Sequence, residues 1–175
     1  MSHKRLFFLD ESAYRLDSCS IYGWSEKGSE AYGYNTCCSW ETMTMIGVMN
    51  SEDICSFMTI DSGATTEIFT AFIEQQLIKH LRPGDCVIMD NISVHKNPHV
   101  KHQIESTGAV VEFLPPYSPD LNPIEKLWSK LKQNLRRMET TTRDIFDKSI
   151  VDAINLIKTS DLQAWIKNAG YQISS

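Results

Sequence analysis

Three acidic residues stand at positions where carboxylates could act together. Asp10 ends the apolar run of residues 6–9, Asp90 ends the apolar run of residues 86–89, and Glu125 opens an amphipathic stretch. Converging carboxylates repel one another and need a counterion, which for an all-oxygen site is usually Mg²⁺ or Mn²⁺. Three such residues at one place therefore indicate metal-dependent chemistry on phosphate esters.

The elements that must position these residues follow from the apolar pattern. Short apolar runs bounded by turn residues predict buried strands, so both aspartates are expected at the C-terminal ends of strands. In open α/β sheets, sites are built at that edge. Residues 11–33, rich in Ser, Gly, Tyr and charge, predict a long excursion with at most a short hairpin.

The rest of the chain predicts an α/β fold. Residues 42–49 and 54–60 resemble an antiparallel strand pair. Helix signals then alternate with strand signals, as a mixed sheet flanked by helices requires. The further predicted elements are a helix at 66–81, a strand at 86–90, a helix from Asn97-Pro98 to Gly108, a strand at 109–114, a helix opened by Asn122-Pro123, and helices at 142–157 and 160–169.

Each acidic residue also has a purely structural explanation. Glu125 lies three residues after Asn122, where a glutamate can complete a capping box. Asp90 before Asn91 could be turn chemistry, and Asp10 could be a solvated strand end. For Glu125 alone, capping and catalysis stay open. All three at element ends that can share one sheet edge favour a common site.

Histidines after Asp90 raise the alternative of a zinc site. His95, His99 and His102 have the spacing of one helical face, but Asn97-Pro98 interrupts helical geometry after His95. A zinc site needs all its ligands to converge, so we disfavour it. His95, five residues past Asp90, is better explained as a partner near the carboxylates.

Charge and composition limit the classes of function. The 175 residues suit one domain, and the net charge of −5 argues against an autonomous DNA-binding module but not against a DNA-processing enzyme. One stretch, residues 126–138, carries basic residues and no acidic ones, and it could be a solvated face or a contact with DNA backbone phosphates. Its basic residues are Lys126, Lys130, Lys132, Arg136 and Arg137.

The sequence shows neither a bilayer-spanning apolar run nor a signal peptide. Its five cysteines are odd in number and lack the C-x-x-C spacing, so we expect a reduced, cytoplasmic protein without membrane contact.

Longer motifs resemble a known family. Met89-Asp90-Asn91 with His95, and Pro115-Pro116-Tyr117-Ser118-Pro119-Asp120-Leu121-Asn122-Pro123-Ile124-Glu125 with Trp128, resemble the DDE transposases of the mariner superfamily, in the bacterial insertion-sequence branch. The 34 residues between Asp90 and Glu125 match the spacing of that branch. The third motif is long and specific, whereas Asp10-Glu11 alone would mean little.

The resemblance implies a ribonuclease H-like fold with a five-stranded mixed sheet and two Mg²⁺ or Mn²⁺ ions. It implies that Asp10, Asp90 and Glu125 are catalytic and bind the metal, supported by Asn91, His95 and Asn122. Such enzymes cut transposon ends and join them to TA targets, acting on paired ends as a homodimer in the nucleoid.

Such transposases also carry N-terminal helix-turn-helix domains. This sequence begins shortly before its first predicted strand, so we expect residues 1–175 to be a single catalytic domain without that recognition part. The alternatives are a structure-specific nuclease on the same fold and a non-catalytic regulator of a full-length transposase.

Overall fold

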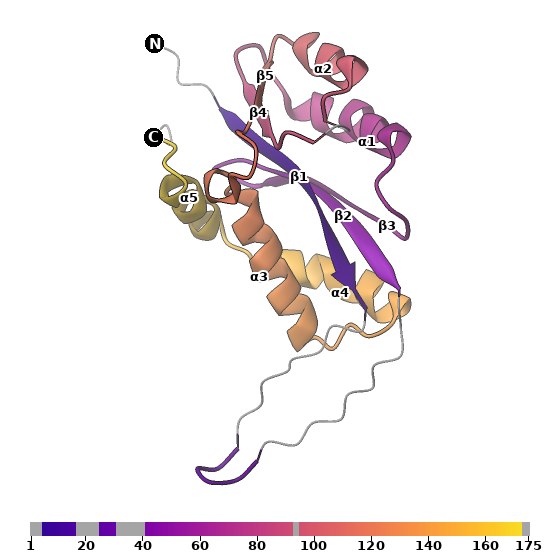
Figure 1. The fold of residues 1–175 in the computed structure, drawn as a ribbon, viewed down its shortest axis with the longest axis vertical. Coiled ribbons are helices and arrows are strands. Elements are labelled where there is room, and N and C mark those ends of the chain that lie inside the picture. Colours follow the sequence, from indigo (N-terminus) through magenta and orange to yellow (C-terminus); the bar gives the residue numbers. More distant parts are fainter. Residues whose placement is uncertain (1–4, 17–24, 31–40, 93–94, 173–175) are drawn as a thin grey trace.

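The computed structural model describes residues 5–16, 25–30, 41–92 and 95–172, and these form one five-stranded sheet flanked by helices. The strands lie in the order β3-β2-β1-β4-β5 (Figure 1). β2 is antiparallel to β1 and β3, whereas β4 is parallel to β1 and β5. The strands are β1 Leu6–Arg15, β2 Thr42–Met49, β3 Ile54–Ile60, β4 Cys86–Met89 and β5 Val110–Phe113.

Helices cover both faces of this sheet (Figure 1). The helices α1 and α2 pack with one hydrophobic core, and α3, α4 and α5 pack with the other. A π-turn and a 3₁₀ turn extend α1, and another 3₁₀ turn precedes α3. The bounds are α1 Thr66–Phe72, η1 Ile73–Leu77, η2 Ile78–His80, α2 Pro98–Glu105, η3 Pro119–Leu121, α3 Ile124–Arg137, α4 Arg143–Asn155 and α5 Thr159–Asn168.

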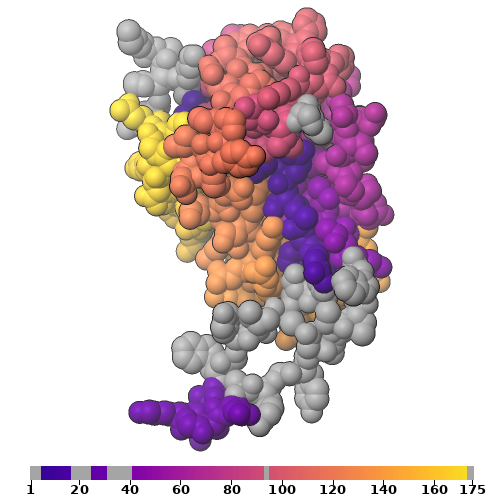
Figure 2. Space-filling model, in the orientation of Figure 1, coloured from indigo at the N-terminus to yellow at the C-terminus, as the bar shows by residue number. Residues whose placement is uncertain are grey.

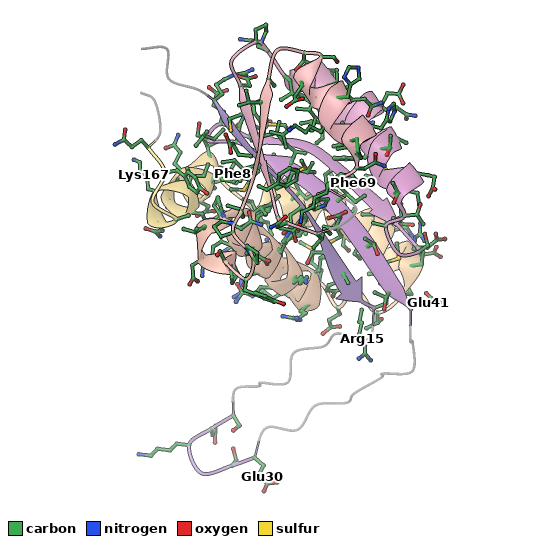
Figure 3. The ribbon with its side chains drawn as sticks, turned by 45° about the horizontal axis from the view of Figure 1, so that its top comes forward. Phe8, Arg15, Glu30, Glu41, Phe69 and Lys167 are labelled. Atoms are coloured by element: carbon green, nitrogen blue, oxygen red, sulfur yellow. The ribbon has the colours of Figure 1, made fainter. Side chains whose placement is uncertain are left out.

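The alternation of side chains along β1 decides which core each residue meets. Phe8 belongs to the core under α3, α4 and α5, while Phe7 and Leu9 belong to the core under α1 and α2. Figure 3 labels Phe8 and Phe69, one from each core. The same alternation turns Asp10 toward α3 and Glu11 toward α1.

Most predicted elements are confirmed, with ends shifted by a few residues. β2 and β3 have the predicted bounds, and α2 begins after Asn97, whose side chain accepts the backbone N–H of His99. Gly108 follows α2 with φ of 83°, a left-handed conformation that glycine adopts without strain. The predicted helix at 66–81 is helical throughout 66–80, although only its first part is α-helix.

The first strand is longer than predicted, so the expected position of Asp10 at a strand end is wrong. β1 continues to Arg15 because β2 pairs with its whole second half, up to Arg15 opposite Thr42. Tyr14 is buried there, where its hydroxyl shares a hydrogen bond of 2.7 Å with Thr140. The excursion expected at 11–33 therefore starts no earlier than Leu16. Its residues 17–24 and 31–33, which include Cys19, lie outside the described residues, and so do Cys37 and Cys38.

Figure 3 labels Arg15 and Glu41, where the chain leaves β1 and re-enters before β2.

None of the helices in the described part of the chain is long and apolar enough to cross a membrane.

Candidate active site

Strand register brings the two aspartates to neighbouring positions. β4 runs parallel to β1 only as far as Met89, which lies opposite Leu9. Asp10 follows Leu9 and Asp90 follows Met89, so the two aspartates come directly after the last paired residues of β1 and β4. At this point β4 ends and β1 continues beside β2 alone. Asp90 therefore follows a strand as predicted, and Asp10 and Asp90 line one shallow cavity beyond the end of β4.

Asp10 is buried and hydrogen-bonded from three directions. The residue is only 6% exposed. Oδ1 accepts the backbone N–H of Glu11 at 2.8 Å, while Oδ2 accepts Nδ2 of Asn122 at 3.3 Å and Nε1 of Trp128 at 3.4 Å. Both side-chain donors come from the start of α3 or the turn before it, so Asp10 ties the central strand to the helix of Glu125.

The position of Trp128 depends on a glycine in the neighbouring strand. Gly47 lies directly opposite Asp10 in the β1–β2 register. A Cβ at Gly47 would come within 2.7 Å of the Trp128 ring, too close for a real contact. The absent side chain thus makes room for an indole that is both core, as the sequence predicts, and a hydrogen-bond donor to Asp10.

On the opposite face of β1, His95 bridges two carboxylates. Its Nδ1 lies 2.6 Å from Oδ1 of Asp90, and its Nε2 lies 2.7 Å from Oε2 of Glu11. The imidazole is fully buried and stacks on Phe69 of α1, with ring centroids 4.5 Å apart. Two acidic partners at these distances favour an imidazolium, because only the protonated ring donates from both nitrogens.

The electrostatics of the three groups reflect these partners. Burial, reinforced by the charges of Glu125 and Asp90, raises the pKa of Asp10 to about 7 against the hydrogen bond from Glu11. Burial alone would lower the pKa of His95, but its hydrogen bonds to Asp90 and Glu11 outweigh burial and raise that pKa to about 9. Burial opposes ionisation of Asp90 too, yet the pKa of Asp90 is lowered because His95 stabilises its charge.

Glu125 occupies the first turn of α3, exposed to solvent. The capping-box explanation is wrong, because the residue at the N-cap is Pro123 and no side chain caps this helix. Asn122 instead directs its amide to Asp10. Glu125 therefore does not cap the helix, and it interacts electrostatically with Asp10. Its charge is one of those that raise the pKa of Asp10.

The donor set fits a hard divalent cation in its chemistry. Three carboxylates share one electrostatic field, and the buried Oδ1 of Asn122 has no hydrogen-bond partner. Oxygen donors of this kind suit Mg²⁺ or Mn²⁺. Their spacing is looser than in a finished metal site: among the described residues, no three His, Cys, Asp or Glu side chains form a group that could hold an ion. Repulsion between carboxylates opposes closer approach.

A cavity of about 400 Å³ opens beside these donors. Asp90, Asn91, Asn122 and Glu125 line it together with the loop of residues 114–119. Asn91 thus lines the same cavity as two of the carboxylates. Figure 2 shows β1, in indigo, reaching the surface between the orange segments and the magenta α1.

The basic residues of α3 divide into two sets. Lys132 and Arg136 follow Glu125 by seven and eleven residues, which places all three on one side of the helix. Lys132 is half-buried, and burial lowers its pKa while the charges of Glu125 and Asp10 oppose that shift. Lys126, Lys130 and Arg137 lie on a different side.

The zinc alternative loses its ligand set in the structure. His95 is fully buried between Asp90 and Glu11, whereas His99 and His102 are exposed on α2. Pro98 at the start of α2 separates the two environments, as the sequence indicated.

Sequence reasoning missed two residues of the site, Glu11 and Gly47. Glu11 follows Asp10 in a strand, so strict alternation would have sent it to the face opposite Asp10, where His95 lies. Gly47 interrupts the apolar second half of β2, which is a recognised sign of close approach by another group. Both signals were present, but neither identified the partner.

Residues 5–146 match the family described as DDE superfamily endonuclease. No curated protein matches the sequence. Among solved structures, the Mos1 strand transfer complex superimposes with a TM-score of 0.76 at 13% identity, covering 94% of this chain and 51% of that chain. The Mos1 transposase paired-end complex with the left transposon end gives 0.74 at 16% identity, covering 94% and 52%.

The Mos1 mariner transposase catalytic domain gives a TM-score of 0.63 at 13% identity, covering 94% of this chain and 76% of that chain. At these identities the likeness shows the fold, which is the ribonuclease H-like one that the resemblance implied. The chain spans about half the length of the Mos1 chains in the two complexes.

Proposed function

The chain belongs to the DDE superfamily of endonucleases, and on that premise we propose that residues 1–175 form a single transposase catalytic domain that cleaves DNA and transfers strands. The register that sets Asp10 beside Asp90, with the charge of Glu125 acting on Asp10, is the observation that carries this proposal. The long motif before Glu125 supports the finer assignment to the bacterial insertion-sequence branch, with joining into TA targets.

We propose that Asp10, Asp90 and Glu125 hold Mg²⁺ or Mn²⁺, two ions per site. When bound, such ions would activate a water or 3′-hydroxyl and stabilise the leaving oxygen of an in-line displacement. Mos1 paired-end complexes have been solved with Mg and with Mn, which supports the same preference here. Asn122 would support the ions on the side of Asp10. Its buried Oδ1 has no partner and is free to accept a hydrogen bond there.

The chain's own residues set the geometry of this chemistry. Trp128 and Asn122 restrict Asp10, and His95 restricts Asp90 while it neutralises part of the local negative charge. Glu125 is the exposed member, so it can adjust when DNA arrives. Restricted ligands lower the reorganisation needed at the moment of reaction.

Contacts with DNA would come from α3. We propose that Lys132 and Arg136, beside Glu125, face the phosphate that reacts, and that Lys126, Lys130 and Arg137 contact backbone further away. Such contacts position DNA without reading its sequence. The domain would act on two transposon ends as a homodimer, and the paired-end complex of Mos1 supports the part of this proposal that concerns paired ends.

A strand-transfer assay tests the function directly. The purified chain is incubated with pre-cut ends, a supercoiled target and Mn²⁺, beside Asp90→Asn and the control Asp152→Asn, whose side chain lies exposed on α4. Joining by the wild type and the control but not by Asp90→Asn is expected. Cutting without joining would indicate the nuclease alternative, and neither activity would indicate the regulator.

Metal binding gives a readout that does not depend on activity. Titration calorimetry with Mn²⁺ should show binding to the wild type and its loss in Asp10→Asn. Equal Mn²⁺ affinity in both proteins would remove Asp10 from the metal site.

A further inference from the structure

Tyr117 combines two unfavourable features beside the carboxylates. Its side chain is fully exposed, with a relative exposure of 103%. Its φ of 57° lies in the left-handed region, which a residue with a Cβ adopts at a cost. Only one other non-glycine residue among those described, Glu139, has a positive φ. A strained, solvent-exposed aromatic ring is not explained by folding, and such residues gather at functional sites.

The loop around Tyr117 is built so that this conformation is held. Pro115 and Pro116 precede it and Pro119 follows, each with a fixed φ. Leu114 donates its N–H to Met89 O at 2.9 Å, which fastens the loop to the end of β4. At the other end, η3 closes the loop, and the Tyr171 hydroxyl donates to Leu121 O at 2.9 Å.

This loop is one wall of the cavity that contains Asp90 and Glu125. Tyr117 and the prolines supply flat apolar surface to this cavity. Ile92, which is 44% exposed, adds an aliphatic side chain, and Asn91 adds an amide. The cavity therefore joins two carboxylates, which would take a phosphate group through the proposed metal ions, with an apolar part suited to a flat ring. A nucleotide has both a phosphate group and a flat ring in one molecule.

We propose that Tyr117 is a stacking platform for an unpaired base of the DNA substrate, held next to the phosphate that reacts at Asp10, Asp90 and Glu125. The proposal rests on the proposed function, since it takes the phosphate at the carboxylates as given. An unpaired base is required because both faces of a paired internal base are covered by its neighbours. Stacking on an aromatic side chain tolerates any base, so this contact selects DNA structure rather than sequence.

Fluorescence of 2-aminopurine tests this contact. The probe replaces the base nearest the reacting phosphate, either unpaired at a frayed end or paired in a continuous duplex, with Ca²⁺ in place of Mg²⁺. Wild-type protein and Tyr117→Phe should quench the unpaired probe. Tyr117→Ala should lose this quenching and bind the frayed end about 5–150-fold more weakly, the range expected for one stacked base. Val151→Ala, which removes an exposed side chain on α4, is the matched control.

Further results of the same experiment separate stacking from loss of folding and from a backbone contact. Tyr117→Gly should raise the unfolding temperature because it relieves the positive φ, and should still lose the quenching, which separates loss of the ring from loss of folding. Equal loss of affinity for frayed and paired DNA in Tyr117→Ala would mean a backbone contact and overturn stacking. Unchanged quenching in Tyr117→Ala would also overturn stacking.

Failure of the proposed function would look different. Wild-type protein would then neither cut nor join with Mn²⁺, whatever the behaviour of Tyr117 variants. Normal cutting and joining by the wild type, together with unchanged 2-aminopurine quenching and affinity in Tyr117→Ala, would overturn the stacking proposal alone.

Discussion

On the strand side of the carboxylate site, Asp10 and Asp90 are restrained by buried partners, whereas on the helix side Glu125 lies exposed at the first turn of α3. Burial makes the charge of Asp10 electrostatically costly, since its pKa rises to about 7, whereas the half-exposed Asp90 is held by its ion pair with His95. Exposure keeps Glu125 hydrated and adjustable. Under the proposed function, the site would combine two restrained ligands with one that can adjust to complete it.

The largest effect should come from neutralising any of the three acids. Asp10→Asn, Asp90→Asn and Glu125→Gln should each lower strand transfer by at least about 10³-fold, because each removes an anionic ligand from the proposed metal site. The rate of joining of pre-cut ends with Mn²⁺ measures this. A retained rate in Glu125→Gln alone would confine the site to the strand side.

The two sides should also differ in the pH dependence of stability. The folded pKa of Asp10 is about 7 and its ordinary value is 3.8, so its protonation favours the folded state. Its stabilising contribution is complete below about pH 3.8 and is lost as the pH rises through about 7, by a few kcal/mol.

Urea unfolding of wild type and Asp10→Asn, without metal, measures this as a difference between two curves. Asp10→Asn should be more stable than wild type at pH 8 and similar at pH 4. Glu125→Gln should match wild type at pH 4 and gain less stability than Asp10→Asn at pH 8, because the charge of Glu125 is only one of the causes that raise the pKa of Asp10. Identical pH curves for wild type and Asp10→Asn would mean that burial does not penalise the charge of Asp10.

Removing the histidine bridge should weaken the strand side. His95→Ala should lower the free energy of unfolding by about 2–4 kcal/mol, because it leaves Glu11 and Asp90 without their shared cation and opens a cavity beside Phe69. His99→Ala, exposed on α2, should change it by less than about 0.5 kcal/mol. Equal free energies of unfolding for His95→Ala and His99→Ala would mean that the His95 bridge does not stabilise the fold.

Crowding the tryptophan should disturb Asp10 from the neighbouring strand. Gly47→Ala should cost about 1–3 kcal/mol because its methyl group would overlap the Trp128 ring. Combining it with Trp128→Phe should recover part of that loss, since the two residues contact each other and their effects should not add. Strictly additive unfolding energies would mean that the ring is not the obstacle.

The smallest effect should separate the two basic sets on α3. Replacing Lys132 and Arg136 by Gln should slow strand transfer more than it weakens DNA binding. Replacing Lys126, Lys130 and Arg137 should mainly flatten the salt dependence of binding, by about one unit of slope for each phosphate that is no longer neutralised. Filter binding at several salt concentrations measures the slope. An unchanged slope would assign that side of the helix to solvent.

Local pattern was enough for most of the fold. Residues 42–49 and 54–60 are largely apolar runs separated by the turn residues 50–53, Asn97-Pro98 caps a helix, and the apolar period of α3 predicts its buried face. These elements therefore depend on neighbours in sequence. The end of β1 does not. It lies at Arg15 rather than Asp10 because β2, a separate stretch of chain, continues to pair with it.

The sequence by itself determined which acids could act, because Asp10 and Asp90 follow apolar runs, and Asp90 and Glu125 stand within motifs whose spacing is specific. Only the tertiary structure decided how they are held. The bridge from Glu11 through His95 to Asp90 and the fit of Trp128 over Gly47 join residues distant in sequence. Such contacts depend on strand register and on which face each side chain takes, and local composition carries neither.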